Sequence, residues 1–179
     1  MKVALQTLAV GLLCSIFLVP VAQGNDDGPT LTFLDGSARS NTSTPISRSH
    51  AWGLSLGNVK LFGGQSFVFS YLNEAHQLDH FGEMHKRDGL AVQRVWTIPL
   101  TKHFRASGVF GPYVTTDTRS TGEKTYEIDY RLNALAGAKL EYDLFLNMSV
   151  VFSFDRVLTW KKLDGDLFFL GLTYRFQSL

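Results

Sequence analysis

The sequence predicts an all-β protein, an eight-stranded antiparallel up-and-down transmembrane β-barrel, and three observations support this. Apolar and polar residues alternate with a period of two in eight separate stretches, as expected when successive side chains point to opposite faces of a strand. The polar connections between these stretches mostly alternate between long and short. No apolar run after the first 24 residues is long enough to cross a bilayer as a helix.

Residues 1–24 have the features of a secretory signal peptide. Lys2 precedes an apolar run from Leu8 to Val21, and small residues stand at Ala22 and Gly24. The run is shorter than the roughly 20 residues of a spanning helix. We therefore expect cleavage after Gly24 and a barrel domain over residues 25–179, without a disulfide because Cys14 is the only cysteine. A closed hydrogen-bond ladder must then hold the barrel together.

The clearest internal strand is Tyr126–Tyr142. Its even positions are tyrosine, leucine, isoleucine or alanine, whereas most odd positions are charged or polar. A strand needs about 9–11 residues to cross a bilayer, so this stretch is long enough to cross and extend beyond it. The tyrosines at both ends of the apolar row are typical of the aromatic girdles of membrane barrels.

Seven further stretches have the same period. They are Thr30–Arg39, His50–Leu56, Phe67–Asn73, Leu90–Ile98, Phe104–Val114, Met148–Phe154 and Leu167–Phe176. Arg94 breaks the pattern, because strict alternation points it toward lipid between Val92 and Trp96. An arginine there costs about 2–4 kcal/mol at the bilayer midplane and little near the interface. We expect a β-bulge at Arg94, or a depth near the lipid headgroups.

The connections indicate the orientation of the barrel. Four polar loops are predicted, at residues 40–47, 74–88, 115–125 and 158–165. The turns around Pro99–His103 and Asp143–Asn147 are short, while Asn58–Ser66 is longer. Outer-membrane barrels have short periplasmic turns and longer external loops. With both termini periplasmic, the four polar loops lie outside, and the predicted location is the bacterial outer membrane.

A water-soluble alternative has the same alternation. A secreted lipocalin is also an eight-stranded barrel, with apolar side chains inside and polar ones outside. The membrane form is favoured by the aromatic Phe176 near the C-terminus and by the lack of cysteine or helix after the barrel. It is also favoured because small and charged residues share one parity, which suits a narrow, filled lumen.

The last strand resembles the terminal strand of bacterial outer-membrane barrels, since it ends in Tyr174-Arg175-Phe176. The assembly machinery recognises such strands, so the resemblance implies that Gly171, Tyr174 and Phe176 form an assembly signal. The whole barrel domain is similar in architecture to the small OmpX and OmpA barrels and to the lipid A-modifying enzymes PagP and PagL. The stretches that resemble a subgroup of such barrels without an established activity are Tyr71–His76, Arg87–Gly89, Gly111–Tyr113 and Asp117-Thr118. The catalytic motifs of PagL and PagP are absent.

The second polar loop holds three of the five histidines. Its candidate chemistry involves Glu74, His76, Asp79, His80 and His85. One hypothesis is a His–carboxylate pair that acts as a general base on a lipid ester at the outer rim. A second is a metal site on His76, His80 or His85. The third, which we favour, is a solvated loop that contacts lipopolysaccharide, with no bound metal or cofactor.

A second group of charged residues has the parity of the lumen. It comprises Arg105, Glu127, Asp129, Arg131, Lys139, Glu141 and Asp155. Unpaired buried charges are costly, so we expect a network of ion pairs that fills the interior. A path for protons or ions is the alternative, although eight strands leave little room for water.

The resulting hypothesis is a monomeric structural or surface-interaction barrel, not an enzyme. Its expected partners are outer-membrane lipids, lipopolysaccharide and, during insertion, the barrel-assembly machinery. A formal net charge of +1 gives no support to nucleic-acid binding. The alternatives are a lipid A hydrolase that uses the His-rich loop and a narrow conduit for small hydrophobic molecules.

Overall fold

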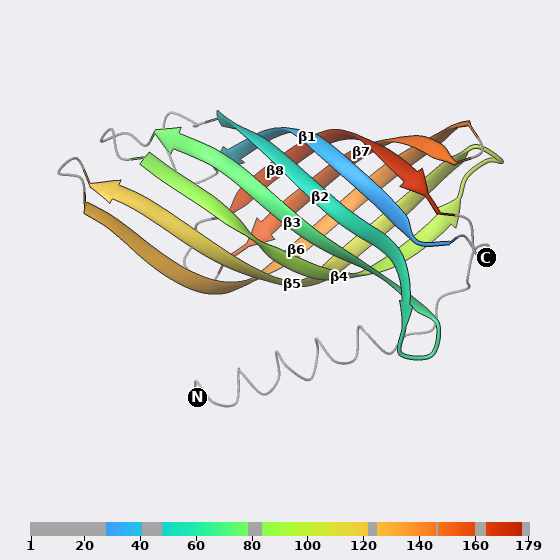
Figure 1. Cartoon of the computed structure of the whole chain (residues 1–179), viewed down its shortest axis with the longest axis horizontal. Coiled ribbons are helices and arrows are strands. Elements are labelled where there is room, and N and C mark those ends of the chain that lie inside the picture. Colours follow the sequence, from blue (N-terminus) through green and yellow to red (C-terminus); the bar gives the residue numbers. More distant parts are fainter. Residues whose placement is uncertain are drawn as a thin grey trace.

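The computed structural model is a closed barrel in which each strand pairs with its neighbours in sequence and β8 pairs with β1 (Figure 1). All pairs are antiparallel, which confirms the predicted fold class. The structure describes residues 28–40, 48–78, 84–121, 125–145, 147–159 and 164–176; the predicted signal peptide lies outside them. The strands are β1 (Thr30–Ser40), β2 (Arg48–Leu61), β3 (Gln65–Leu78), β4 (Met84–Pro99), β5 (Phe104–Thr121), β6 (Thr125–Phe145), β7 (Met148–Leu158) and β8 (Gly165–Arg175).

The two ends of the barrel differ. The start of β1 and the end of β8 lie together, with Thr30 opposite Arg175. The turns that join β2 to β3, β4 to β5 and β6 to β7 are at this same end (Figure 1), which is the expected periplasmic end. No helix in the described part of the chain is both long and apolar enough to span a bilayer.

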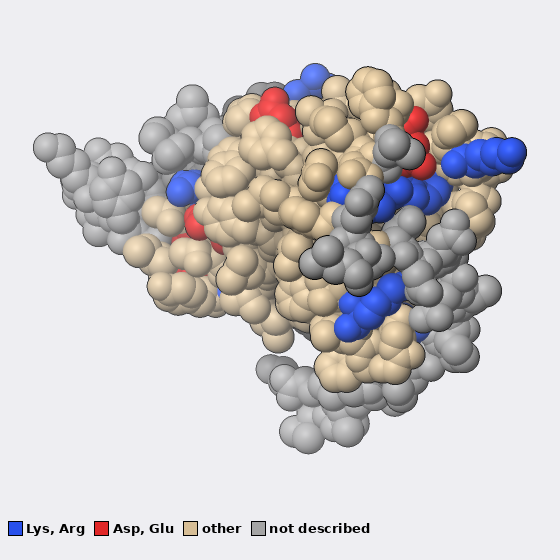
Figure 2. All heavy atoms as spheres, turned by 45° about the vertical axis from the view of Figure 1, so that its right-hand side comes forward, with Lys and Arg blue, Asp and Glu red and all other residues tan. Residues whose placement is uncertain are grey.

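The exterior of the barrel is apolar. Leu132 is 64% exposed on the outside of β6, whereas its neighbour Asn133 is 5% exposed and donates a hydrogen bond to Thr115 inside. Leu54, Phe152 and Leu170 are also large, exposed apolar side chains on other strands. Figure 2 shows an exterior with few charged side chains over much of the visible barrel wall. A lipocalin has polar side chains outside, whereas this barrel has apolar ones outside. Such an apolar exterior needs lipid around it.

The middle of the lumen is closed by packed side chains. Leu72, Tyr113, Leu135 and Phe169 are almost fully buried there. Glycine makes room for these large groups: a Cβ atom on Gly89 would lie 2.9 Å from Cε2 of Tyr113, and one on Gly53 would lie 2.7 Å from Cδ2 of Leu72. The lumen is consequently divided into two halves, which are called outer and periplasmic after the expected orientation.

Two of the predicted loops are wrong. Within residues 74–88, β3 continues to Leu78 and β4 begins at Met84; within residues 115–125, β5 continues to Thr121 and β6 begins at Thr125. The polar residues of these stretches suggested loops in the sequence. They extend the ladder, and three of their charged residues, Glu74, Arg87 and Asp117, pair with one another inside the barrel.

The predicted turn 58–66 is shorter than expected, and Arg94 shows no bulge. The turn between β2 and β3 contains Phe62, Gly63 and Gly64, all with positive φ, and a register shift in β2 precedes it. Toward β5 the register is the same on both sides of Arg94, and toward β3 it is unshifted from Glu74–Arg87 to its last pair, Phe67–Arg94, so the expected bulge is wrong. Its guanidinium lies instead over the ring of Trp96, 5.1 Å from the centroid.

Candidate functional site

A charged cluster occupies the outer half of the lumen. The Arg87 Nε atom lies 2.9 Å from Asp117 Oδ1, and Arg87 Nη1 lies 3.8 Å from Glu74 Oε1. Arg131 bridges Asp117 at 3.4 Å and Asp129 at 2.7 Å. Adjacent strands β3, β4, β5 and β6 each contribute to this network, because its members share the inward parity of the ladder.

This outer cluster spans the lumen. A Cβ atom on Gly165, across the barrel on β8, would lie 3.6 Å from Arg87 Nη1. Glu74 is almost fully buried, and Arg87 and Asp117 are mostly buried. Charges removed from water in this way are stable only when paired. The cluster therefore acts as a rigid closure above the packed middle of the lumen.

A second cluster lies in the periplasmic half. Arg105 Nη2 donates to Glu141 Oε1 at 2.8 Å and to Asp143 Oδ1 at 2.7 Å. Arg175 Nη2 on the last strand approaches the same two carboxylates at 3.5 and 3.4 Å. Two arginines thus share two carboxylates, which ties β8 to β5 and β6 where the barrel closes.

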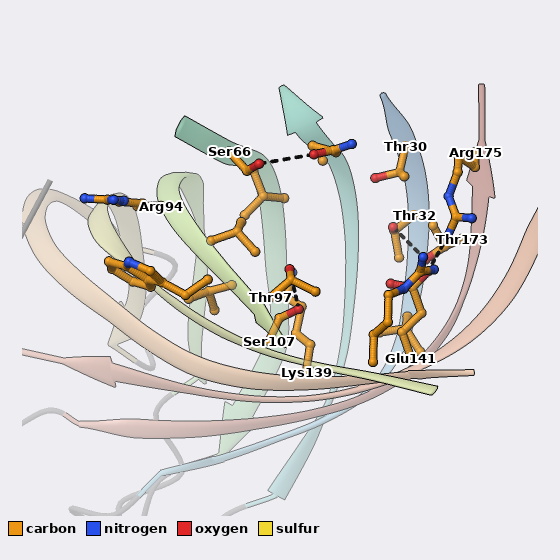
Figure 3. Close-up of a pocket in the computed structure, with 18 of the residues that line it drawn as sticks. Thr30, Thr32, Ser66, Arg94, Thr97, Ser107, Lys139, Glu141, Thr173 and Arg175 are labelled. Carbon is orange, nitrogen blue, oxygen red and sulfur yellow. Dashed lines mark hydrogen bonds and ion pairs between the residues drawn. The ribbon is translucent and has the colours of Figure 1, made fainter. Parts of the chain in front are cut away.

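Beside this second cluster is a cavity of about 840 Å³ (Figure 3). Residues of β1, β4, β5, β6, β7 and β8 line it, together with the hairpin between β2 and β3. Six of its lining residues are basic and one is acidic: Lys60, Arg94, Lys102, Arg105, Lys139, Arg175 and Glu141. Pockets that bind small molecules have volumes of about 300–1,000 Å³. This cavity is therefore the best candidate binding site in the lumen.

The structure separates the predicted lumen charges into groups. Asp129 and Arg131 belong to the outer cluster, and Arg105 and Glu141 to the periplasmic one. Lys139 lines the cavity, and Asp155 is buried in the lumen, where it accepts a hydrogen bond from Ser153 and attracts the Lys139 ammonium. The side chain of Glu127 lies outside the described residues.

The sequence interpretation missed several members of the two clusters. They are Arg87, Asp117, Asp143 and Arg175, as well as Glu74 in its lumen position. Extending the two-residue alternation through the polar stretches would have found Arg87, Asp117, Asp143 and Glu74. Which charges pair across the barrel depends on strand register, which the sequence pattern does not supply.

The His-rich loop is only partly described. Glu74 faces the lumen beside Arg87 and is almost fully buried, so its expected place at the lipid rim is wrong. The side chains of His76, Asp79, His80 and His85 lie outside the described residues. Among the residues that are described, no group of three or more His, Cys, Asp or Glu side chains is arranged to hold a metal ion.

The residues of the predicted assembly signal lie where the barrel closes. Gly171 faces Leu34 in the pairing of β8 with β1. The rings of Tyr174 and Phe176 meet edge to face at 5.2 Å on the exterior. The backbone N–H of Phe176 donates to the carbonyl of Pro29 at 2.9 Å.

At the opposite end, β5 and β6 form a projecting ribbon, defined here as residues 116–121 and 125–133. β6 has 21 residues, but β7 pairs with it only from Ala134 to Phe145. Within the described part of the chain, residues 125–133 of β6 therefore pair only with β5. Figure 1 shows the ends of these two strands extending beyond the rest of the barrel. Tyr130, 75% exposed, lies on the ribbon's outer face.

Comparison with solved structures identifies the architecture. The barrel is similar to Neisserial surface protein A (TM-score 0.65, 11% identity, 83% of this chain and 97% of that chain). It is also similar to Ail, the attachment invasion locus protein of Yersinia pestis (0.59, 12%, 84% and 99%). The N-terminal barrel domain of Pseudomonas aeruginosa OprF matches as well (0.56, 14%, 84% and 100%).

No protein-family model and no curated protein matches the sequence. At 11–14% identity the structural matches show the fold, and this fold is that of the small outer-membrane β-barrels. The expected architecture is thus confirmed. Together with the apolar exterior, it supports the predicted location in the bacterial outer membrane.

Proposed function

We propose that the protein is a surface-interaction barrel of the outer membrane whose external end contacts lipopolysaccharide. The observation that carries this proposal is the projecting ribbon. A strand of about 9–11 residues suffices to cross the bilayer, so the additional length of β5 and β6 serves a purpose outside it. The unpaired edge of β6 presents backbone donors and acceptors to a ligand, and Tyr130 adds an exposed aromatic ring.

Basic side chains at the same end fit the phosphates of lipopolysaccharide. Arg48, Lys86 and Arg156 stand on the exterior faces of β2, β4 and β7, near the outer ends of these strands. Arginine and lysine form charge-assisted hydrogen bonds with phosphate oxygens. Apolar side chains below these groups and cations at the rim match a ligand with acyl chains and phosphates. Insertion by the assembly machinery and a monomeric state are part of this proposal.

Two other functions have less support. A through-conduit needs an open lumen, and the packed middle of this barrel closes it. The hydrolase hypothesis depends on histidine side chains outside the described residues and stays a prediction. The Yersinia protein of the same fold is named for attachment and invasion, which is consistent with such barrels presenting interaction surfaces.

Binding of purified lipopolysaccharide tests the proposal directly. The protein is reconstituted in phosphatidylcholine vesicles and its affinity is measured for the parent chain, Arg48→Gln and Tyr130→Ser. One basic group at an anionic lipid surface changes affinity by about fivefold, so Arg48→Gln should weaken binding by that factor. Phe145→Ser is the matched control, because Phe145 is 74% exposed at the periplasmic end. An equal loss with Phe145→Ser, or no binding by the parent chain, would refute the proposal.

A further inference from the structure

The barrel wall contains a gap between β3 and β4. Their hydrogen-bonded register ends at the pair Phe67–Arg94. Beyond it, Gln65 and Ser66 pair with β2 alone, and residues 95–99 pair with β5 alone. The hairpin of β2 and β3 bends away from β4 at this point, as Figure 1 shows. A register shift after Leu56 and a positive φ at Asn58 produce the bend.

The cavity in the periplasmic half extends into this gap. Thr97 faces the lumen, where its hydroxyl is hydrogen-bonded to that of Ser107. Trp96 and Arg94 lie on the exterior parity of the same strand. All of these residues line one cavity, and Figure 3 shows Arg94 at one side of it and Thr97 within it. The cavity therefore reaches through the gap in the wall to residues of the exterior parity, of which Arg94 is 3% exposed.

The chemistry of the cavity favours an anion. The arginines at 105 and 175 are bound to Glu141 and Asp143. Lys60, Lys102 and Lys139 form no salt bridge with any residue that the structure describes; Lys60 only donates to the hydroxyl of Ser66. Among the described residues, Lys60 and Lys102 thus face the cavity without a carboxylate close by, whereas Lys139 is attracted to the buried carboxylate of Asp155. With six basic lining residues, the cavity keeps an excess of positive charge.

The walls of the cavity add an apolar component. Leu34, Val68, Val109 and Val151 line its lumen side. At the gap, the half-buried Trp96 ring lines the cavity on the exterior parity of β4, under the guanidinium of Arg94; aromatic rings near the ends of membrane strands are typical of the headgroup region. Figure 2 shows Lys and Arg side chains gathered at the periplasmic end that this view brings forward. The combination fits a molecule with a phosphate and acyl chains.

We propose that the gap between β3 and β4 binds an anionic phospholipid of the periplasmic leaflet. The phosphate enters the cavity toward Lys60 and Lys139, and the acyl chains remain in the bilayer against Trp96. This site is separate from the external ribbon, so it stands or falls independently of the proposed function. A free phosphate ion from the periplasm has the same phosphate chemistry as the lipid headgroup, and the test below distinguishes the two ligands.

Fluorescence quenching of Trp96 tests this proposal. The protein, with Trp52 and Trp160 changed to Phe, is reconstituted in phosphatidylcholine vesicles that contain brominated phosphatidylglycerol or brominated phosphatidylcholine at equal mole fraction. The phosphatidylglycerol should quench Trp96 more strongly. Lys139→Gln should lower this preference by about fivefold, the effect of one basic group near an anionic lipid. Lys60→Gln, on the hairpin, should act similarly and leaves the barrel core unchanged.

Two controls make the result decisive. Arg156→Gln removes an exterior cation outside the cavity and should leave the preference unchanged; an equal loss would mean that general surface charge is responsible. Inorganic phosphate is titrated calorimetrically into the protein in phosphatidylcholine vesicles. The lipid proposal is overturned if phosphate releases binding heat with the parent chain but not with Lys139→Gln, and the parent chain shows no preference for phosphatidylglycerol. The site would then bind free phosphate. Equal quenching by both lipids in the parent chain would also overturn it.

Discussion

The guanidinium of Arg87 on β4 lies 2.9 Å from the carboxylate of Asp117 on β5, inside the outer half of the barrel. Glu74 and Arg131 complete a network over four adjacent strands. Because the pairs are mostly buried, each member depends on the others for its stability. The network closes the lumen below the proposed interaction surface and holds the base of the ribbon in a fixed geometry.

Removal of Arg87 should destabilise the barrel. Arg87→Met leaves Glu74 and Asp117 without their shared cation, and we expect a loss of about 3–5 kcal/mol in the free energy of unfolding. Urea unfolding in lipid vesicles measures it. Arg156→Met is the matched control, because Arg156 is 46% exposed and its pair with Asp166 is long at 3.7 Å; its loss should stay below about 1 kcal/mol. Similar losses in the two variants would contradict the role of the outer cluster.

The two glycines of β5 should respond differently to alanine. In Gly111→Ala, the new Cβ atom would meet the carbonyl oxygen of Val92 at 2.0 Å, whereas Gly108 has open space around its Cβ position. The backbone must shift in the first variant, so its barrel should unfold at a lower temperature. Gly108→Ala should match the parent chain. Heat-dependent mobility on cold gels reports the difference, and unchanged melting of Gly111→Ala would show that the wall is less tightly packed than described.

A charge on the exterior should be poorly tolerated. Leu54 is exposed on β2, where it pairs with Phe33 and Tyr71. Leu54→Arg should cost about 2–4 kcal/mol in vesicles if the residue lies near the bilayer midplane. Leu54→Phe should cost much less, since it keeps an apolar side chain toward lipid. If the arginine variant is as stable as the parent chain, the exterior of β2 does not contact lipid.

The final strand should be needed for assembly. Phe176 packs on Tyr174 and its backbone bonds Pro29 where the barrel closes. Phe176→Ala should lower the folded yield in outer membranes and leave unassembled chain in the periplasm. Phe145→Ala removes an equally large and more exposed ring from the same end and should preserve the yield. Equal folded bands for both variants on cold gels would rule out Phe176 as part of an insertion signal.

The sequence predicted the strand number, their order and the apolar exterior because the two-residue period is strong in each strand. It failed where polar residues continue a strand, as at Arg87 and Asp117, since polarity alone suggests a loop. It also missed the gap beside Arg94. Strict alternation gave this residue the exterior parity, but its side chain is 3% exposed. The end of the β3–β4 ladder depends on the bend in the neighbouring hairpin. The pairing of Arg175 with Asp143 required the closed register.

The position of the ribbon outside the cell is the central claim, and single-cysteine labelling in intact bacteria measures it directly. In a chain with Cys14→Ser, the substitutions Tyr130→Cys and Phe145→Cys introduce thiols at highly exposed sites on opposite ends of the barrel. A maleimide reagent that does not cross the outer membrane should label the cysteine at position 130 and leave that at 145 unlabelled until the cells are broken. Labelling of position 145 in intact cells, with position 130 protected, would contradict the orientation and the surface-interaction function with it.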